Sequence, residues 1–139
     1  MQNLLANKPV YSCPIELMWS DLDAYQHVSH IAYLRMIEEC RSRWMESVPS
    51  DWQGDDQGPV VANINIDYRQ SLYWPNTVQV SLQAGAIGRS SLTLAHELST
   101  EGDQGRIVHA EASVTVVWID KRTGRPVPLP ESIRQLAGD

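Results

Sequence analysis

The stretch SHIAYLRMIEECRSRWMESV, residues 29–48, decides the fold because it is a long segment with a helical hydrophobic period. Its apolar side chains recur at steps of three or four and are broadened by two neighbours: Ile31, Tyr33, Leu34, Met36, Ile37, Cys40, Trp44 and Val48. The pattern predicts one amphipathic helix with a broad apolar face. Ser29 is the expected N-cap, and Pro49 is expected to end the helix. A helix of this length needs one large apolar surface to cover it.

The residues on either side of this helix carry the period of two that is typical of β-strands. Alternating apolar and polar residues occupy four later segments, at 62–69, 77–86, 92–98 and 108–118. Short turns join them, and an earlier extended segment at 10–19 contains Pro14, which marks an edge strand. The order of strand, long helix and four strands predicts an α+β fold, an antiparallel five-stranded sheet around one long central helix.

The remaining segments are expected to be irregular. Residues 49–59 contain three Asp and two Gly and are predicted to form a solvated loop. Prolines at 126, 128 and 130 are expected to end the fold in an extended tail with a short polar terminus.

Length and charge narrow the class of protein. The chain has 139 residues, of which 42% are apolar, and this fits a single domain over residues 1–139. Eleven Lys and Arg against 17 Asp and Glu give a net charge of −6. This charge argues against nucleic-acid binding, because neutralising phosphates supplies most of that affinity. An anionic small ligand stays open where a few arginines gather.

The cysteines and the N-terminal residues bear on location. Cys13 and Cys40 form no CxxC pair and are expected to be free thiols. Residues 1–9 carry no long apolar segment, and no apolar run in the chain reaches the length of a membrane span. We therefore expect a protein of the reducing cytoplasm that is not inserted in a membrane.

The densest polar cluster is WSDLDAYQHVSH, residues 19–30, where two carboxylates and two imidazoles precede the helix. The first N–H groups of a helix lack partners within it, and its dipole places about half a positive charge there. Such an end can receive a carbonyl oxygen that becomes negative during acyl transfer. A neighbouring carboxylate can attack that carbonyl or take a proton from water. The cluster therefore indicates hydrolysis of an activated acyl group.

Each of these residues also has a structural interpretation, which stays open. Asp21 is well placed to cap a helix. His27 and His30 lie three residues apart and, with Asp23, resemble part of a metal site. Because a third His or Cys ligand is missing nearby, we expect no metal there. A histidine in such a position is more often hydrogen-bonded than catalytic.

The run DLDAYQHVSHIAYL, residues 21–34, with EECR at 38–41, resembles the signature of hotdog-fold acyl-CoA thioesterases of the 4-hydroxybenzoyl-CoA thioesterase type. That signature reads D-x-D-x-x-G-H-V-N-N-x-x-Y, with E-x-A-R later in the helix. Similarity continues in DYR at 67–69, IGRSS at 87–91 and GRPVPLP at 124–130.

The resemblance implies a hotdog fold and hydrolysis of an acyl- or aroyl-CoA. It implies that Asp23 is the catalytic carboxylate and that the backbone N–H of His30 binds the thioester carbonyl. Some relatives have a catalytic histidine at that position, while His27 is implied to shape the pocket. Candidates for contact with coenzyme A are Arg89, Ser90 and Ser91.

Partners follow from the same resemblance. The substrate is expected to be an acyl-CoA, with an acyl-carrier-protein thioester as the alternative, and no cofactor or metal is expected. A homodimer or homotetramer with sites at the interface is implied. Independently, long regular strands leave a sheet edge that is commonly buried by pairing.

The sequence departs from the signature at Gln26, which replaces the motif Gly, and at Ser29-His30, which replaces Asn-Asn. Gln tolerates a positive φ less well than Gly, so we expect the loop backbone to change there. Two other functions stay open. One is a hotdog hydratase-dehydratase that acts on enoyl or hydroxyacyl thioesters through a carboxylate–His pair. The other is an acyl-CoA-binding member without activity.

Five further residues are expected to matter less for chemistry. His96 and His109 are predicted to be hydrogen-bonded strand residues. Glu38 and Glu39 lie in the helix and pair with arginines or face solvent, with a minor alternative in which one is the catalytic carboxylate. Cys40 is expected to pack in the core.

Overall fold

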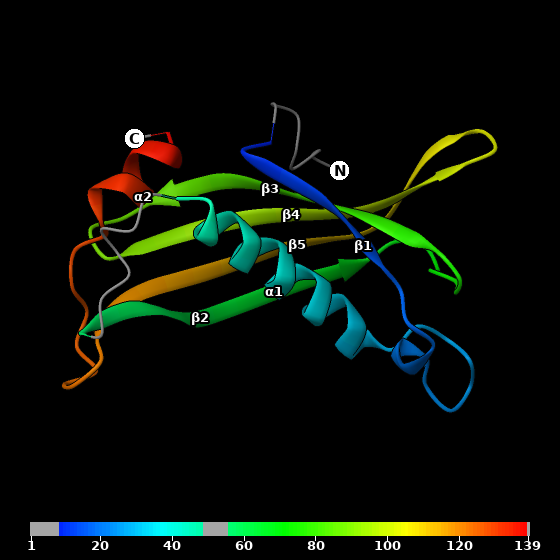
Figure 1. Cartoon of the computed structure of the whole chain (residues 1–139), viewed down its shortest axis with the longest axis horizontal. Helices are drawn as coiled ribbons and strands as arrows, with labels where there is room; N and C mark the ends of the chain where they lie inside the picture. The colour runs from blue at the N-terminus through cyan, green and yellow to red at the C-terminus, as the bar shows by residue number, and fades with distance from the viewer. Residues whose placement is uncertain (1–8, 49–55, 139) are drawn as a thin grey trace.

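The structure is a computed structural model that describes residues 9–48 and 56–138. In chain order the elements are β1 (Tyr11–Glu16), the 3-10 helix η1 (Trp19–Asp21), α1 (His30–Glu46), β2 (Gln57–Tyr68), β3 (Thr77–Ile87), β4 (Ser91–Gly102), β5 (Gly105–Asp120) and α2 (Glu131–Leu136). Figure 1 shows the strands as one curved sheet with α1 lying across one face.

The five strands form one antiparallel sheet in the order β1-β3-β4-β5-β2. The two strands flanking α1 in the sequence are therefore the two edges of the sheet, and the last three strands form its centre. Pro14 lies in the edge strand β1 opposite Gln79, where a missing N–H is tolerated. The predicted α+β architecture, a five-stranded sheet around one long helix, is confirmed.

The hydrophobic core lies between α1 and the sheet. Alternate residues of the three central strands are fully buried there: Val78, Val80, Leu82, Leu92, Leu94, Leu98, Val114 and Trp118. From α1, Met36, Ile37, Cys40 and Trp44 complete this cluster. Removing such a side chain from water stabilises the fold by about 1.5–3 kcal/mol. The core therefore fixes α1, and with it the position of the helix N-terminus, against the sheet.

Helix α1 begins where the sequence predicts. The Ser29 side chain accepts a hydrogen bond from the Ile31 amide at 3.2 Å, which confirms the N-cap. Ile31 belongs to the predicted apolar stripe, but it is 64% exposed. At 3.6 residues per turn it lies on the opposite side of α1 from the buried Cys40, so the sheet does not cover it.

Two expectations about irregular segments are wrong. The loop expected at 49–59 lies largely outside the described residues, but its last residues, from Gln57 on, already belong to β2. The expected polar terminus contains α2, because Ile133 is fully buried and tertiary packing stabilises a helix too short to show a period.

Candidate active site

The segment between η1 and α1 folds back on itself and brings the candidate residues to the N-terminus of the helix. An isolated bridge joins Leu22 to Val28 across this segment. The amide of Asp23 also donates to the carbonyl of His27 at 2.8 Å. Because these contacts close the loop just before Ser29, the loop side chains are held beside the first turn of α1.

Asp21 is the structural carboxylate of this loop. It is 8% exposed, and its Oδ2 accepts hydrogen bonds from the Met18 amide at 2.8 Å and from Nη2 of Arg35 at 2.7 Å. Nε of Arg35 donates to Oδ1 at 3.2 Å. The Asp21 carbonyl accepts from the Ser29 amide at 2.9 Å. Asp21 therefore ties the loop to α1, which supports its structural interpretation.

Asp23 has a different environment. Its side chain is exposed, and Oδ1 accepts hydrogen bonds from the amides of Tyr25 at 2.9 Å and His27 at 3.1 Å. These two bonds, that to His27 first, lower the pKa of the Asp23 carboxyl because they stabilise its charged form. Oδ2 makes no hydrogen bond to any described residue. Asp23 is thus an oriented, ionised carboxylate with one oxygen free.

Gln26 keeps the loop backbone that the signature glycine allows. Its φ is +64°, the one positive φ at a non-glycine residue in the described part of the chain. The expectation that Gln would change the loop backbone is therefore wrong. The amide of Gln26 donates to the Asp23 carbonyl at 3.0 Å, and this turn holds the backbone of Gln26 in a conformation that is strained for a residue other than glycine.

The N-terminus of α1 offers one unpaired backbone donor beside this loop. The Ile31 amide is capped by the Ser29 side chain, and the Ala32 amide donates to the Ser29 carbonyl at 2.9 Å. The amide of His30, the first helical residue, has no partner among the described residues. It is therefore free to donate to a substrate oxygen, with the helix dipole favouring negative charge there.

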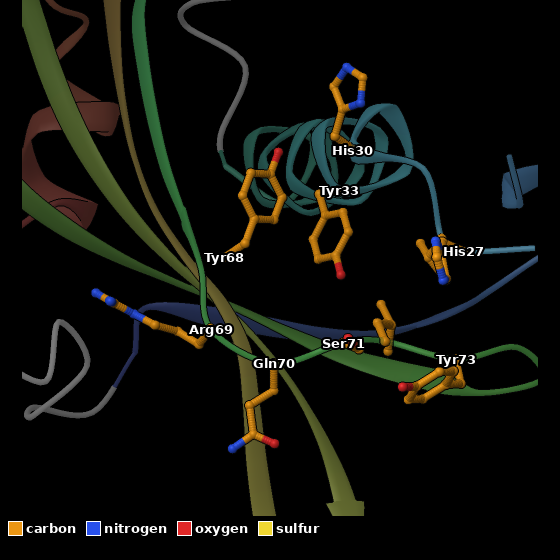
Figure 2. Close-up of a pocket in the computed structure, with 10 residues that line it drawn as sticks. His27, His30, Tyr33, Tyr68, Arg69, Gln70, Ser71 and Tyr73 are labelled. Carbon is orange, nitrogen blue, oxygen red and sulfur yellow. The ribbon is translucent and has the colours of Figure 1, made fainter. Parts of the chain in front are cut away.

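A cavity of about 340 Å³ lies between this helix end and the segment that follows β2. Its lining consists of His27, Val28, His30, Tyr33, Tyr68, Arg69, Gln70, Ser71, Leu72 and Tyr73. Figure 2 shows Tyr33 directed from the helix toward Ser71, while the imidazole of His30 points away from that wall. Of the predicted site residues, His27 and His30 border this cavity.

Asp23 borders a smaller hollow of about 210 Å³ on the same loop, together with Asp21, Ser29 and Arg35. The structure thus places the carboxylate and the His30 amide on one short loop and helix start. It does not place the carboxylate in the lining of the larger cavity.

Residues 17–136 match the sequence model of the thioesterase-like superfamily. The chain belongs to this superfamily. It is 32% identical over 116 residues, 82% of this chain and 86% of the relative, to the long-chain acyl-CoA thioesterase FadM of Escherichia coli K12.

Two solved structures of similar fold extend this comparison. The PA2801 protein of Pseudomonas aeruginosa is 34% identical, with a TM-score of 0.83 over 92% of this chain and 98% of that one. A thioesterase from Thermus thermophilus, complexed with coenzyme A and Zn, is 29% identical, with a TM-score of 0.77 over 93% and 98%. This member of the thioesterase-like superfamily is therefore a thioester hydrolase of the hotdog fold.

The residues predicted to contact coenzyme A lie away from the cavity at the N-terminus of α1. Arg89 and Ser90 lie in the turn between β3 and β4, Ser91 is the first residue of β4, and Arg89 is exposed. The Leu129 amide donates to the Arg89 carbonyl at 2.9 Å, which fixes the turn against the C-terminal segment. Figure 1 places this turn at the opposite end of the sheet from the N-terminus of α1. Within one chain these residues do not join the cavity.

Sequence reasoning missed the tyrosines of the cavity. The rings of Tyr33 and Tyr68 meet edge to face with centroids 4.9 Å apart. Burial raises the pKa of Tyr33, with a smaller contribution from Tyr68. The resemblance in the motif ending at Tyr33 and in DYR at 67–69 was the available signal, but it did not show that the two segments face one cavity.

The remaining candidates have structural surroundings. Glu38 is exposed and lies 4.0 Å from Arg41, whereas Glu39 pairs with Arg35 and Arg43.

Among the described residues, no group of three His, Cys, Asp or Glu side chains could hold a metal ion. None of the described helices is long and apolar enough to cross a membrane.

The two strand histidines differ. His109 is hydrogen-bonded as expected. The same expectation is wrong for His96, which is fully buried with both ring nitrogens unpartnered among the described residues. Burial, aided by the charge of Arg41, lowers the pKa of His96 to about 3, so this ring is neutral and packs as a core side chain.

Proposed function

We propose that the chain hydrolyses the thioester of an acyl- or aroyl-CoA to the free acid and coenzyme A. The observation that carries this proposal is the ionised Asp23 on the loop that leads directly to the free amide of His30. Family membership supports the reaction class. FadM, similar to this chain over most of its length, is a long-chain acyl-CoA thioesterase.

In this proposal the thioester carbonyl oxygen accepts a hydrogen bond from the His30 amide. The oxygen becomes negative in the transition state, where the helix N-terminus stabilises it. Asp23 either takes a proton from the water that attacks the carbonyl carbon, or attacks that carbon itself. The second route gives an acyl-aspartyl anhydride, which water hydrolyses to free Asp23. The carbon–sulfur bond breaks, and the sulfur leaves and is protonated as coenzyme A. The acyl group leaves as a carboxylic acid with one oxygen from water.

The cavity beside this helix end is the proposed binding site for the acyl group. His27 shapes its mouth, and Tyr33 and Tyr68 supply an aromatic wall. His30 lines the cavity, and its backbone N–H is the group proposed to contact the thioester. An acyl-carrier-protein thioester would present the same reacting atoms, so it stays the alternative substrate.

A homodimer or homotetramer is proposed because the edge strand β2 is exposed. Its apolar residues Val60, Val61 and Ile64 are 39–44% exposed in the single chain. Proteins usually cover a long unpaired edge strand, and a second copy of the chain would cover this one. Antiparallel pairing of two β2 strands around a two-fold axis reverses the second sheet end to end. The turn Arg89–Ser91 of the second copy then lies at the same end as the first copy's cavity, where it can contact coenzyme A.

A cytoplasmic location is proposed from the thiols. Cys13 and Cys40 are both free and buried, as expected for a protein that folds in a reducing compartment.

A thiol-release assay over a panel of acyl- and aroyl-CoA esters tests the proposed function. We expect release of coenzyme A with at least one ester, at a rate that saturates with substrate. Crotonyl-CoA serves as the comparison: loss of enoyl absorbance without thiol release would favour the hydratase alternative. Binding of coenzyme A without hydrolysis of any ester would favour an inactive acyl-CoA-binding protein.

A further inference from the structure

The wall of the cavity opposite α1 is held by a buried histidine outside the motif. His109 lies in β5 and is 4% exposed. Nδ1 of its ring is 3.0 Å from the carbonyl oxygen of Ser71 and 3.2 Å from that of Gln70. Both of these residues line the cavity. His109 therefore contacts the cavity wall from behind.

The partners of the ring define its protonation. Carbonyl oxygens only accept hydrogen bonds, so Nδ1 must carry the proton and donate it to Ser71 and Gln70. In the neutral ring Nε2 is then an acceptor. Nε2 is 2.7 Å from Oγ1 of Thr100, a 6% exposed residue of β4, and the hydroxyl donates to it. The two carbonyls thus fix the tautomer in which His109 binds the wall, and Thr100 holds the ring at its other nitrogen.

The backbone of His109 binds the same segment. Its carbonyl accepts from the amides of Arg69 at 2.8 Å and Gln70 at 3.4 Å. Strand β2 ends at Tyr68, so these amides and the carbonyls of Gln70 and Ser71 lie past the regular β2–β5 ladder. One residue of β5 therefore pairs both donors and acceptors of the chain as it leaves the sheet.

The segment held in this way supplies half of the cavity lining. Residues 69–73 contribute five of the ten lining residues. Figure 2 shows Ser71 opposite Tyr33, with the side chains of Arg69 and Gln70 directed away from α1. The distance between this wall and the helix end sets the width of the cavity. A shift of the wall would change acyl binding without touching Asp23 or the His30 amide.

We propose that Thr100 and His109 form a positioning pair that fixes the acyl-binding wall at residues 69–73. This inference rests on the proposed thioesterase function. The pair acts through the backbone of Gln70 and Ser71 and does not touch the substrate. His109 is a positioning residue, and its contribution appears in substrate binding more than in the chemical step.

The test compares His109→Leu with His109→Asn, using the ester that the wild-type chain hydrolyses fastest. Leu removes the donor, and we expect KM to rise about tenfold with kcat within about threefold, the effect of one lost buried hydrogen bond. Asn places its Nδ2 as many bonds from the backbone as Nδ1 of His. It keeps the donor to the wall, so KM should return to within about threefold of wild type.

His96→Leu is the matched control, because His96 is a buried histidine of the same sheet whose ring bonds nothing among the described residues. It should leave KM unchanged. An unchanged KM in His109→Leu, a rise as large in His109→Asn, or an equal rise in His96→Leu would each overturn the positioning role. The positioning role would also be overturned if His109→Leu lowered only the melting temperature and the active fraction. Nitrogen-15 NMR of wild-type imidazoles should show a protonated Nδ1 on His109, and a protonated Nε2 alone would overturn the arrangement.

Failure of the two proposals can be told apart. A wild-type chain that releases no thiol from any ester overturns the proposed function, and the use of the pair in acyl binding with it. An active wild-type chain whose His109 variants keep their KM overturns the positioning role alone.

Discussion

Asp21 and Asp23 lie two residues apart on one loop, yet their surroundings assign them opposite tasks. Both oxygens of Asp21 accept hydrogen bonds, from Arg35 and the Met18 amide, and the side chain is buried. Asp23 has one oxygen held by two amides and the other free at the surface. A carboxylate whose acceptors are filled holds the structure, whereas one that is oriented but half free can react.

The comparison is tested most strongly by Asp23→Asn. The amide keeps the shape and a hydrogen-bond acceptor but is neither nucleophile nor base, so we expect kcat to fall by about 10³-fold or more. Because Asp23 is exposed, the melting temperature should change little. Thiol release and thermal unfolding of the same preparation measure both. Hydrolysis within tenfold of wild type would remove Asp23 from the mechanism and reopen the minor alternative at Glu38 or Glu39.

The helix end next to Asp23 is tested by His30→Pro, with His30→Ala as its matched control. Proline at the first helical position removes only an N–H that has no helical partner. Ser29, with φ −64° and ψ 144°, already has the conformation favoured before proline. Loss of this donor should lower kcat by about 10²–10³-fold. His30→Ala keeps the amide and should stay within about tenfold, since the ring points away from the cavity wall. Equal losses in both variants would assign the role to the imidazole instead.

The fold and the start of α1 were predictable from the sequence for a physical reason. The period of α1 and the alternation of β3, β4 and β5 record which side chains are buried, and the core confirms both except at Ile31. The Ser29 cap was predictable because it depends on neighbouring residues only. Helix α2 was not, because six residues show no period and Ile133 is buried by contacts distant in sequence.

The roles of the site residues required the third dimension. Two Asp in a D-x-D run look alike until Arg35, 14 residues away, pairs with one of them. The cavity wall at 69–73 follows a strand end and carries no period, so its place opposite α1 depends on tertiary bonds to His109. His96 and His109 also look alike in sequence, and only their neighbours separate a core ring from a hydrogen-bonded one.

The structural side of the comparison predicts that Asp21→Asn destabilises the protein. The substitution removes the charge that pairs with Arg35 and weakens the bond to Met18. Because Arg35 is itself about a third exposed, we expect a loss of about 2 kcal/mol in the free energy of unfolding. Urea unfolding measures it, and kcat of the folded fraction should stay within about threefold. A fall in kcat beyond threefold in the folded fraction, with little change in the free energy of unfolding, would contradict the division of roles.

The pH profile separates Asp23 from the nearby imidazoles. The amides of His27 and Tyr25 lower the pKa of Asp23, so its charged form persists below the usual range of a carboxyl. We expect kcat/KM to stay level from neutral pH down to about pH 4 and then to fall up to tenfold per pH unit. The pH dependence of folding stability has the same sign. The lowered pKa of Asp23 adds stability above the pKa of the unfolded state, and this stability is lost as the pH falls through the pKa of the folded state. An acid limb that begins well above the usual range of a carboxyl would contradict the role of Asp23.

The smallest expected effect lies at Gln26, between the two carboxylates and the helix. Its φ of +64° strains a Gln side chain but not a Gly, so Gln26→Gly should stabilise the fold by about 1 kcal/mol. Gln26→Ala keeps the strain and is the matched control, with no gain expected. Because the Asp23–His27 contacts already hold the loop in the signature conformation, kcat should not change in either variant. A gain in kcat for Gln26→Gly would mean that the strained turn displaces Asp23 from its reactive position. Equal stability of the two variants would mean that the backbone conformation at residue 26 is not a source of strain.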